Sequence, residues 1–190
     1  MTDVAGVVLC GGMSRRMRRD KALIEIEGQP LVVRVAERVA QVCEPVFLAP
    51  GRVRLGPLGY PSVADAAEDA GPLGGLIGAL RASPHPWMAA VAVDMPFASP
   101  GVLRLLAGLA GGEDAVVPVT TNGPEPLHAL YHRSCLPPAE RALSEGRNGL
   151  RSLLEELCVR FVGEDEWRPA DPEGRFALNL NRVEDVAALE

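Results

Sequence analysis

Short apolar runs separated by segments of helical spacing restrict most strongly what this chain can fold into. Residues 4–10 form an unbroken run of small and β-branched residues, typical of a strand buried on both faces of a parallel sheet. Residues 45–49 and 87–93 repeat that pattern, whereas 30–42 and 71–80 carry apolar residues at helical intervals. Strands that alternate with helices form right-handed βαβ units. We therefore predict a three-layer, Rossmann-like α/β fold with a mostly parallel central sheet.

The second half of the chain continues this pattern less regularly. It predicts strands at 114–119, 127–132 and 175–180, and helices at 100–110, 138–145, 149–157 and 183–189. The Gly- and Pro-rich stretch 52–60 is interpreted as a surface loop and not as a domain boundary. At 190 residues the chain has the length of one sizeable domain, so 1–190 is predicted to be a single domain.

Composition excludes several classes of protein. A net charge of −6 argues against general nucleic-acid binding, because no overall positive field would attract a phosphate backbone. No apolar run approaches the roughly 20 residues that span a bilayer, and no secretory signal is visible at the start. The four cysteines form no CxxC pair, which favours reduced, buried thiols over a disulfide framework or zinc site. These features predict a cytoplasmic protein.

The loop that follows the first strand, residues 9–21, is the first candidate for a ligand site. In open α/β sheets, ligands bind beyond the carboxyl ends of the strands. The adjacent Gly11 and Gly12 would let backbone N–H groups approach phosphate oxygens, and Arg16 and Lys21 would add charged donors. The segment is neither a GxGxxG dinucleotide fingerprint nor a P-loop. Its alternative interpretation is a solvated basic turn.

Two acidic residues are the further candidates. Asp94 directly follows the buried run 87–93, and Mg²⁺ prefers one or two carboxylates together with phosphate oxygens and water. Its alternative role is to cap the turn before Pro96. Asp65 lies shortly before Gly74 and Gly75, which would leave backbone donors open to an anion at a helix start. A simple loop leading into a helix is the competing interpretation there.

The 9–21 segment resembles the signature L-A-G-G-x-S-x-R-M-G-x-D-K of the molybdenum cofactor guanylyltransferases. Two positions depart from it, Cys10 for the usual Ala and Arg18 for the usual Gly. The likeness extends in family order from about residue 4 to 186, and its later parts include a P-L-x-A-L-Y element at 126–131. The signature positions that match are Leu9, Gly11, Gly12, Ser14, Arg16, Met17, Asp20 and Lys21.

The resemblance implies a nucleotidyltransferase fold whose N-terminal part binds the nucleotide and whose C-terminal part faces a pterin. It implies that Asp94 holds Mg²⁺ and that Arg16, Lys21 and Asp94 are catalytic. Where the family often has an Asn for guanine recognition, this chain has Gly51. The implied binding residues are Leu9, Cys10, Gly11, Gly12, Lys21, Asp65, Asp94, Asn179 and Asn181.

Asn179 and Asn181 match the family's N-[IL]-N element, and as alternate residues of a strand they would share one face. Contacts to the pterin or its phosphate, and ordering of the turn before the last helix, remain open for them. His128 and His132 would lie about 13 Å apart on a strand, which favours a structural or surface role over metal binding. Arg151, like Arg147, is either a phosphate contact for the second substrate or a solvated helix residue.

The activity that the resemblance implies is transfer of GMP from GTP to the terminal phosphate of the molybdenum-pterin cofactor, with release of pyrophosphate. GTP, Mg²⁺ and the molybdenum-pterin are then the ligands, and enzymes that make or receive the cofactor are candidate partners. The alternatives are a pterin cytidylyltransferase, a sugar-phosphate nucleotidyltransferase, or a non-catalytic protein that binds and delivers a nucleotide or cofactor. The presence of both Lys21 and Asp94 favours an enzyme.

Overall fold

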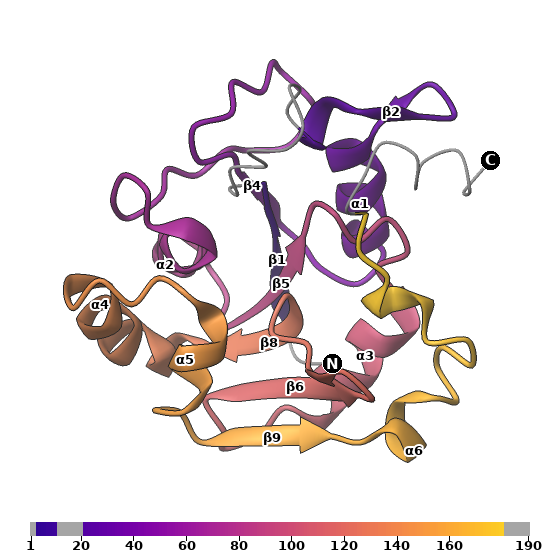
Figure 1. Ribbon diagram of the computed structural model, residues 1–190, viewed down its shortest axis with the longest axis vertical. Coiled ribbons are helices and arrows are strands. Elements are labelled where there is room, and N and C mark those ends of the chain that lie inside the picture. Colours follow the sequence, from indigo (N-terminus) through magenta and orange to yellow (C-terminus); the bar gives the residue numbers. More distant parts are fainter. Residues whose placement is uncertain (1–2, 11–20, 181–190) are drawn as a thin grey trace.

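A computed structural model describes residues 3–10 and 21–180 of the chain. Within them, a central sheet of seven strands has the order β4-β1-β5-β8-β6-β7, and β9 pairs with the other edge of β6 (Figure 1). The strands are β1 (Val4–Leu9), β4 (Val46–Ala49), β5 (Trp87–Ala92), β6 (Ala115–Thr120), β7 (Gly123–Pro124), β8 (His128–His132) and β9 (Val159–Val162).

Most of these strands run in one direction. β4 and β5 are parallel to β1, and β8 is antiparallel to both β5 and β6. β6 therefore runs the same way as β5, and β9 is parallel to β6. Only β7 and β8 run against the others in the described sheet. The prediction of a mostly parallel α/β sheet is confirmed, with one antiparallel strand inserted at its middle.

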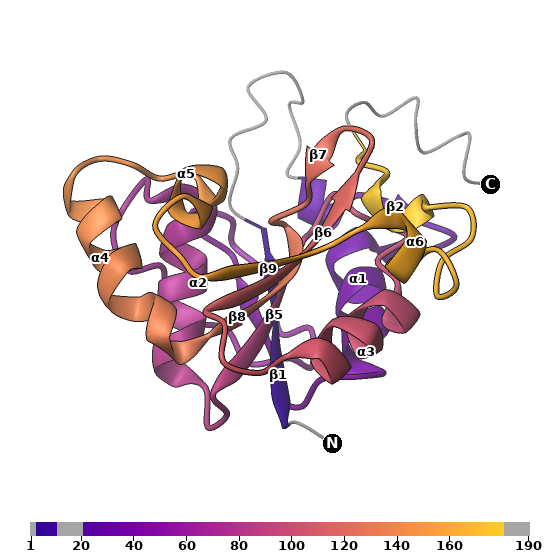
Figure 2. The same ribbon diagram turned by 90° about the horizontal axis from the view of Figure 1, so that it is seen from below.

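Helices cover both faces of the sheet (Figure 2). One face carries α1 (Leu31–Ala40) and α3 (Pro100–Leu109), and the other carries α2 (Gly71–Ala82), α4 (Leu136–Ser144) and α5 (Leu150–Leu154). Alternate residues of β1 enter separate cores, since Val8 packs on the α1 side and Val7 on the α2 side. The predicted three layers are thus confirmed. The short elements are the hairpin β2 (Glu25–Ile26) and β3 (Gln29–Pro30), the 3₁₀ helices η1 (Lys21–Leu23), η2 (Arg133–Cys135) and η3 (Arg175–Ala177), and α6 (Glu164–Trp167).

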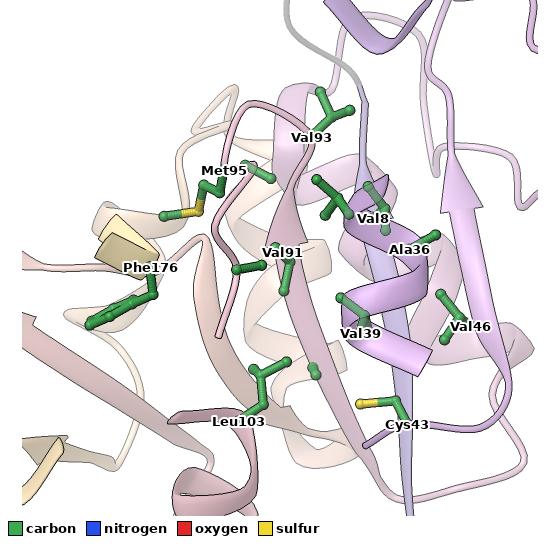
Figure 3. Close-up of a cluster of buried hydrophobic side chains, with 14 of the residues drawn as sticks. Val8, Ala36, Val39, Cys43, Val46, Val91, Val93, Met95, Leu103 and Phe176 are labelled. Atoms are coloured by element: carbon green, nitrogen blue, oxygen red, sulfur yellow. The ribbon is translucent and has the colours of Figure 1, made fainter. Parts of the chain in front are cut away.

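The core on the α1 side contains a residue from far along the chain. Figure 3 shows Val39 from the end of α1 and Cys43 from the segment after it lying against β1 and β4, while Phe176 enters from η3. Phe176 is fully buried, and its ring lies 4.8 Å from that of His128 and 5.1 Å from that of Trp167. This packing fixes the position of the segment 178–180 that follows.

The predicted strand at 175–180 is wrong. Gly174 adopts a left-handed φ of 64°, and the Asp171 carboxylate accepts the backbone N–H groups of Arg175 and Phe176. This capping turns the chain into η3 instead of allowing it to extend. The predicted helix at 183–189 lies outside the described residues. β9 and the β2–β3 hairpin were not predicted, and Pro30 precedes α1 as its N-cap instead of starting the helix.

The cysteines agree with the predicted thiols at three of four positions. Cys10, Cys43 and Cys135 are buried and free, and burial raises the pKa of each thiol to about 12. Cys158 is also free but exposed, so the expectation of burial is wrong for it. Among residues 3–10 and 21–180, no helix has the length and apolar character needed to cross a bilayer.

Candidate functional site

The carboxyl ends of β1, β4 and β5 meet at one point of the sheet edge. Leu9 is in register with Ala49 on one side and Ala92 on the other. Beyond the strand, the Cys10 N–H donates to the Ala49 carbonyl at 2.9 Å, and the Val93 N–H donates to the Leu9 carbonyl at 3.1 Å. The chain thus leaves β1 between two neighbouring strand ends, where open α/β sheets bind ligands. Gly11, Gly12 and Arg16 follow directly but lie outside the described residues, so their phosphate contacts stay predictions.

Lys21 and Asp94 lie together at this edge although 73 positions separate them in sequence. Lys21 Nζ is 3.3 Å from Asp94 Oδ2 and donates a 2.7 Å hydrogen bond to the carbonyl of Leu180. The two side chains are 18% and 29% exposed, so solvent and ligands can reach the pair. The Leu180 N–H also donates to the Asp94 carbonyl, at 2.8 Å. The backbone of Leu180 was not predicted to contribute, and no side-chain pattern could have revealed it.

The Asp94 side chain does not cap its own turn. The turn after β5 is closed by the backbone, through Met95 N–H to Ala92 O at 3.2 Å and Ala98 N–H to Met95 O at 3.0 Å. In the described part of the chain, the hydrogen-bond partner of the Asp94 carboxylate is Lys21. The arrangement therefore favours a ligand-directed role over the alternative of a turn cap.

The same carboxylate could hold a divalent cation. Mg²⁺ needs one or two protein carboxylates and completes its shell with phosphate oxygens and water. No group of three or more His, Cys, Asp or Glu side chains with metal-binding geometry occurs among the described residues. A dedicated protein cage is therefore absent there, whereas the partly exposed Asp94 fits a cation shared with a phosphate ligand.

Asp65 reaches this edge from the other side of β1. The chain after β4 runs back beside it, with Leu48 N–H donating to Pro61 O at 2.9 Å and Val63 N–H to Leu48 O at 2.8 Å. This pairing carries Asp65 past the end of β4 and onto the first turns of α2. A Cβ at Gly75 would lie 3.6 Å from Asp65 Oδ1 and only 2.8 Å from Leu9 Cδ2. Glycine is needed here because α2 approaches the strand ends closely.

The Asp65 carboxylate has an unsatisfied acceptor. Its Oδ1 is buried and has no hydrogen-bond partner among residues 3–10 and 21–180. Burial raises the pKa of this carboxyl, and the backbone N–H of Gly51 opposes that shift. A buried carboxylate oxygen without a donor is costly, so a bound N–H or O–H group would stabilise it. Asp65 thus offers an acceptor for a ligand at this end of the sheet.

The C-terminal candidates are placed only in part. Asn179 adjoins Leu180 and lies next to the Lys21–Asp94 pair; its Nδ2 donates to the Ala177 carbonyl at 3.4 Å. Asn181 lies outside the described residues. The residues before Asn179 form η3 and not a strand, so the predicted strand is absent there; the shared face of Asn179 and Asn181 stays a prediction.

The histidines have structural roles, as predicted. His128 is fully buried, its Nε2 accepts the Ser99 N–H at 3.0 Å, and burial lowers its pKa to about 4. His132 Nδ1 accepts the Ser134 N–H at 3.2 Å. Arg147, in the connection between α4 and α5, pairs with Glu145 and Glu156, which ties it into a surface ion network. Arg151 donates to the Pro124 carbonyl at 3.1 Å and therefore lies at the same sheet edge as β7.

Comparison with known proteins agrees with this geometry. The profile of the family described as the MobA-like NTP transferase domain matches residues 6–161. The molybdenum cofactor guanylyltransferase of Desulfosudis oleivorans is 32% identical over 100% of this chain and 96% of its own length. The probable molybdenum cofactor guanylyltransferase of Methanosarcina mazei is 35% identical over 96% of this chain and 88% of its own.

Solved structures show the same architecture. The molybdopterin-guanine dinucleotide biosynthesis protein A of Archaeoglobus fulgidus superposes with a TM-score of 0.82 at 27% identity, covering 100% of this chain and 97% of that one. The 2-C-methyl-D-erythritol 4-phosphate cytidylyltransferase of Thermus thermophilus, at 16% identity and a TM-score of 0.70 over 98% and 96% of the two chains, shares the fold alone. The family profile matches most of the chain, relatives match it along its whole length, and the fold is shared. This protein therefore belongs to the MobA-like NTP transferase family, a family of nucleotidyltransferases.

Proposed function

We propose that this enzyme transfers GMP from GTP to the terminal phosphate of the molybdenum-bound pterin and releases pyrophosphate. The observation that carries the proposal is the full-length likeness, at 32% and 35% identity, to relatives named molybdenum cofactor guanylyltransferase. The Lys21–Asp94 pair at the end of β5 supports it. A site that binds phosphate groups together with a metal ion needs a cationic side chain for the phosphates and a carboxylate for the metal.

The chemistry calls for charge neutralisation more than for proton transfer. The acceptor is already an anionic phosphate, so no strong base is needed to make it nucleophilic. The barrier comes from repulsion between two polyanions and from the charge that develops on the leaving pyrophosphate. Lys21 is held in place by the Leu180 carbonyl. Together with Arg16 and the backbone N–H groups of Gly11 and Gly12, it would reduce the repulsion between the substrates and stabilise the charge on the leaving pyrophosphate.

Asp94 is the residue that would hold Mg²⁺. Its partly exposed carboxylate at the strand end fits a cation bound jointly by protein and triphosphate. When bound, the ion would supply positive charge that polarises the reacting phosphate and stabilises the leaving group. Lys21 would orient the Asp94 carboxylate by the contact that it makes to Oδ2.

We further propose that residues 1–190 act as one domain with two functional halves. The strands β4, β1 and β5 would serve the nucleotide, with Leu9, Cys10, Lys21 and Asp65 at their ends. The strands β8 and β6 continue the same sheet, so an acceptor bound at their edge would lie beside the nucleotide. Asn179 and Asn181 would contact the pterin or its phosphate. The expected place of action is the cytoplasm, and enzymes that make or receive the cofactor are the expected partners.

Pyrophosphate release tests the activity. The purified protein is incubated with Mg²⁺, molybdenum-pterin and one of GTP, CTP, ATP or UTP at equal concentration, and pyrophosphate is measured. We expect release with GTP and little with the other three. A clear preference for CTP would overturn guanylyl transfer, an outcome of interest because Gly51 supplies no amide for base recognition. Tight GTP–Mg²⁺ binding without pyrophosphate would instead indicate a delivery protein.

A further inference from the structure

Glu125 lies at the same end of the sheet as Asp94 but next to the ends of different strands. Because β8 is antiparallel to β5, its first residue pairs with Val91 near the end of β5, and the Ala92 N–H donates to the Leu127 carbonyl at 2.9 Å. The Glu125 N–H donates to the Pro118 carbonyl at 2.9 Å, beside the end of β6. Figure 2 shows this arrangement: β1 runs upwards from the N-terminus, and β7, which leads into Glu125, lies at the top.

The Glu125 carboxylate is half-buried and incompletely hydrogen-bonded. Its Oε1 lies 3.2 Å from the Thr120 hydroxyl, which also lies 3.2 Å from the Gly123 carbonyl, so one hydroxyl proton is shared between two acceptors. Its Oε2 has no hydrogen-bond or ion-pair partner in the described part of the chain. Burial raises the pKa of this carboxyl, while the Thr120 hydrogen bond and the charge of Arg151 lower it. A carboxylate in such surroundings gains from two further donors.

A fixed donor lies next to this acceptor. Arg151, in the first turn of α5, is held by its hydrogen bond to Pro124 O at 3.1 Å. Within residues 3–10 and 21–180, its guanidinium makes no ion pair of 4.0 Å or less with Glu125, although its charge acts on that carboxyl. Both side chains therefore keep polar atoms for a ligand. Together they offer carboxylate acceptor oxygens and a cationic donor to a ligand.

That pattern matches one class of ring edge. A heterocycle that carries an exocyclic amino group, a ring N–H and a carbonyl in sequence offers two parallel donors and then an acceptor. The two carboxylate oxygens would accept the donors, and the guanidinium would donate to the carbonyl. Guanine and the pterin ring share this edge, so the chemistry alone does not separate the two substrates.

The order of the strands in the sheet distinguishes between the two substrates. Asp65 lies at the end of β4, Asp94 at the end of β5, and Glu125 beyond β8 and β6, so Asp94 stands between the other two along the sheet. A nucleoside near Asp65 places the reacting phosphates at Asp94 and leaves the Glu125 side for the acceptor. We propose that Glu125, with Arg151, binds the amino and N–H edge of the acceptor's pterin ring, an inference that rests on the proposed function.

The decisive variant is Glu125→Gln, which keeps the shape and the Thr120 contact but replaces one acceptor by a donor. We expect the KM for molybdenum-pterin to rise about 10- to 100-fold, as for loss of a hydrogen bond to a charged group, while the KM for GTP stays within about 3-fold. Glu140→Gln, which removes an exposed ion pair with Arg81, is the matched control and should change neither constant. Thermal melting of each variant shows that the fold is retained.

A binding experiment keeps the inference separate from the proposed activity. Neopterin fluorescence and GTP–Mg²⁺ calorimetry give the affinity of each ring without turnover. Weaker neopterin binding by Glu125→Gln with unchanged GTP affinity supports the assignment even where the wild type releases no pyrophosphate, an outcome that would refute only the proposed function. Weaker GTP binding with unchanged neopterin binding overturns it in favour of guanine, and unchanged affinity for both overturns it altogether.

Discussion

The two halves of the sheet reach the candidate site by different means. On the side that we propose for the nucleotide, called the nucleotide side below, β4, β1 and β5 are regular parallel strands whose ends bring Leu9 and Asp94 to one point. On the side that we propose for the acceptor, called the acceptor side below, the strands reverse direction, and the position of residues depends on single long-range contacts, such as Lys21 to Leu180 across 159 positions. Parallel strands of regular register fix the positions of the residues at their ends, whereas residues on the acceptor side are held by individual long-range contacts. The two sides should therefore respond differently to substitution.

The largest effect should come from removing the anchor of the acceptor side. Phe176→Ala empties a fully buried site between His128 and Trp167, and we expect a loss of about 3–5 kcal/mol in the free energy of unfolding. Urea denaturation measures this loss. Phe161→Ala is the matched control because Phe161 is 51% exposed on β9, and its cost should stay within about 0.5 kcal/mol. Equal losses at both positions would refute the idea of an anchor.

The same contrast explains what could be predicted from the sequence. The strands β1, β4 and β5 and the helices between them were predicted to within two residues at each end, because unbroken apolar runs and helical spacing report burial directly. Asp94 was found because it ends such a run. Its proximity to Lys21 follows from the topology, and the structure adds the 3.3 Å contact.

The C-terminal segment was predicted less well for a physical reason. The sequence around Phe176 alternates like a strand, but capping by Asp171 and the left-handed Gly174 bend it into η3. Local side-chain-to-backbone bonds of this kind override the apolar pattern. The backbone of Leu180 and the half-buried Glu125 carry no periodic signal either. Their importance depends on which strands lie next to each other, which one sequence does not report.

Asp94 stands at the boundary between the two sides, so its removal should disable both. For Asp94→Ala we expect kcat to fall by about 10²–10³-fold, by analogy with loss of one transition-state-stabilising group, with little change in melting temperature. Pyrophosphate release measures the effect. Asp165→Asn changes an exposed carboxylate of α6 and should leave kcat unaltered. Near-normal turnover by Asp94→Ala would contradict its assignment as the metal ligand.

Among buried groups, His128 should make the folded protein sensitive to acid. Burial lowers the pKa of His128 from 6.5 to about 4, so the unfolded chain binds a proton there more readily than the folded protein does. Its contribution to stability is therefore complete above pH 6.5 and is lost as the pH falls towards 4, by about 3 kcal/mol from 1.36 kcal/mol per pKa unit.

Urea denaturation from pH 7 to pH 4 checks this, with His128→Gln as the comparison because Gln can still accept the Ser99 N–H without titrating in that range. We expect the variant to lose less stability on acidification than the wild type. Parallel pH profiles for the two proteins would show that other groups cause the acid sensitivity.

The smallest effect tests the close packing on the nucleotide side. A Cβ at Gly78 of α2 would lie 2.1 Å from the backbone carbonyl oxygen of Ala64, so Gly78→Ala must displace the segment that carries Asp65. We expect a loss of about 1–3 kcal/mol in stability, as for overpacking, and a raised KM for GTP with the KM for the pterin unchanged.

Gly108→Ala in α3 is the matched control, since nothing lies within 4 Å of its Cβ position and Ala is the better helix former; it should gain up to about 1 kcal/mol. An equal rise in both KM values for Gly78→Ala would mean that the strain spreads across the sheet, and that the two halves are not independent. A rise confined to GTP would instead assign Asp65 and α2 to the nucleotide alone.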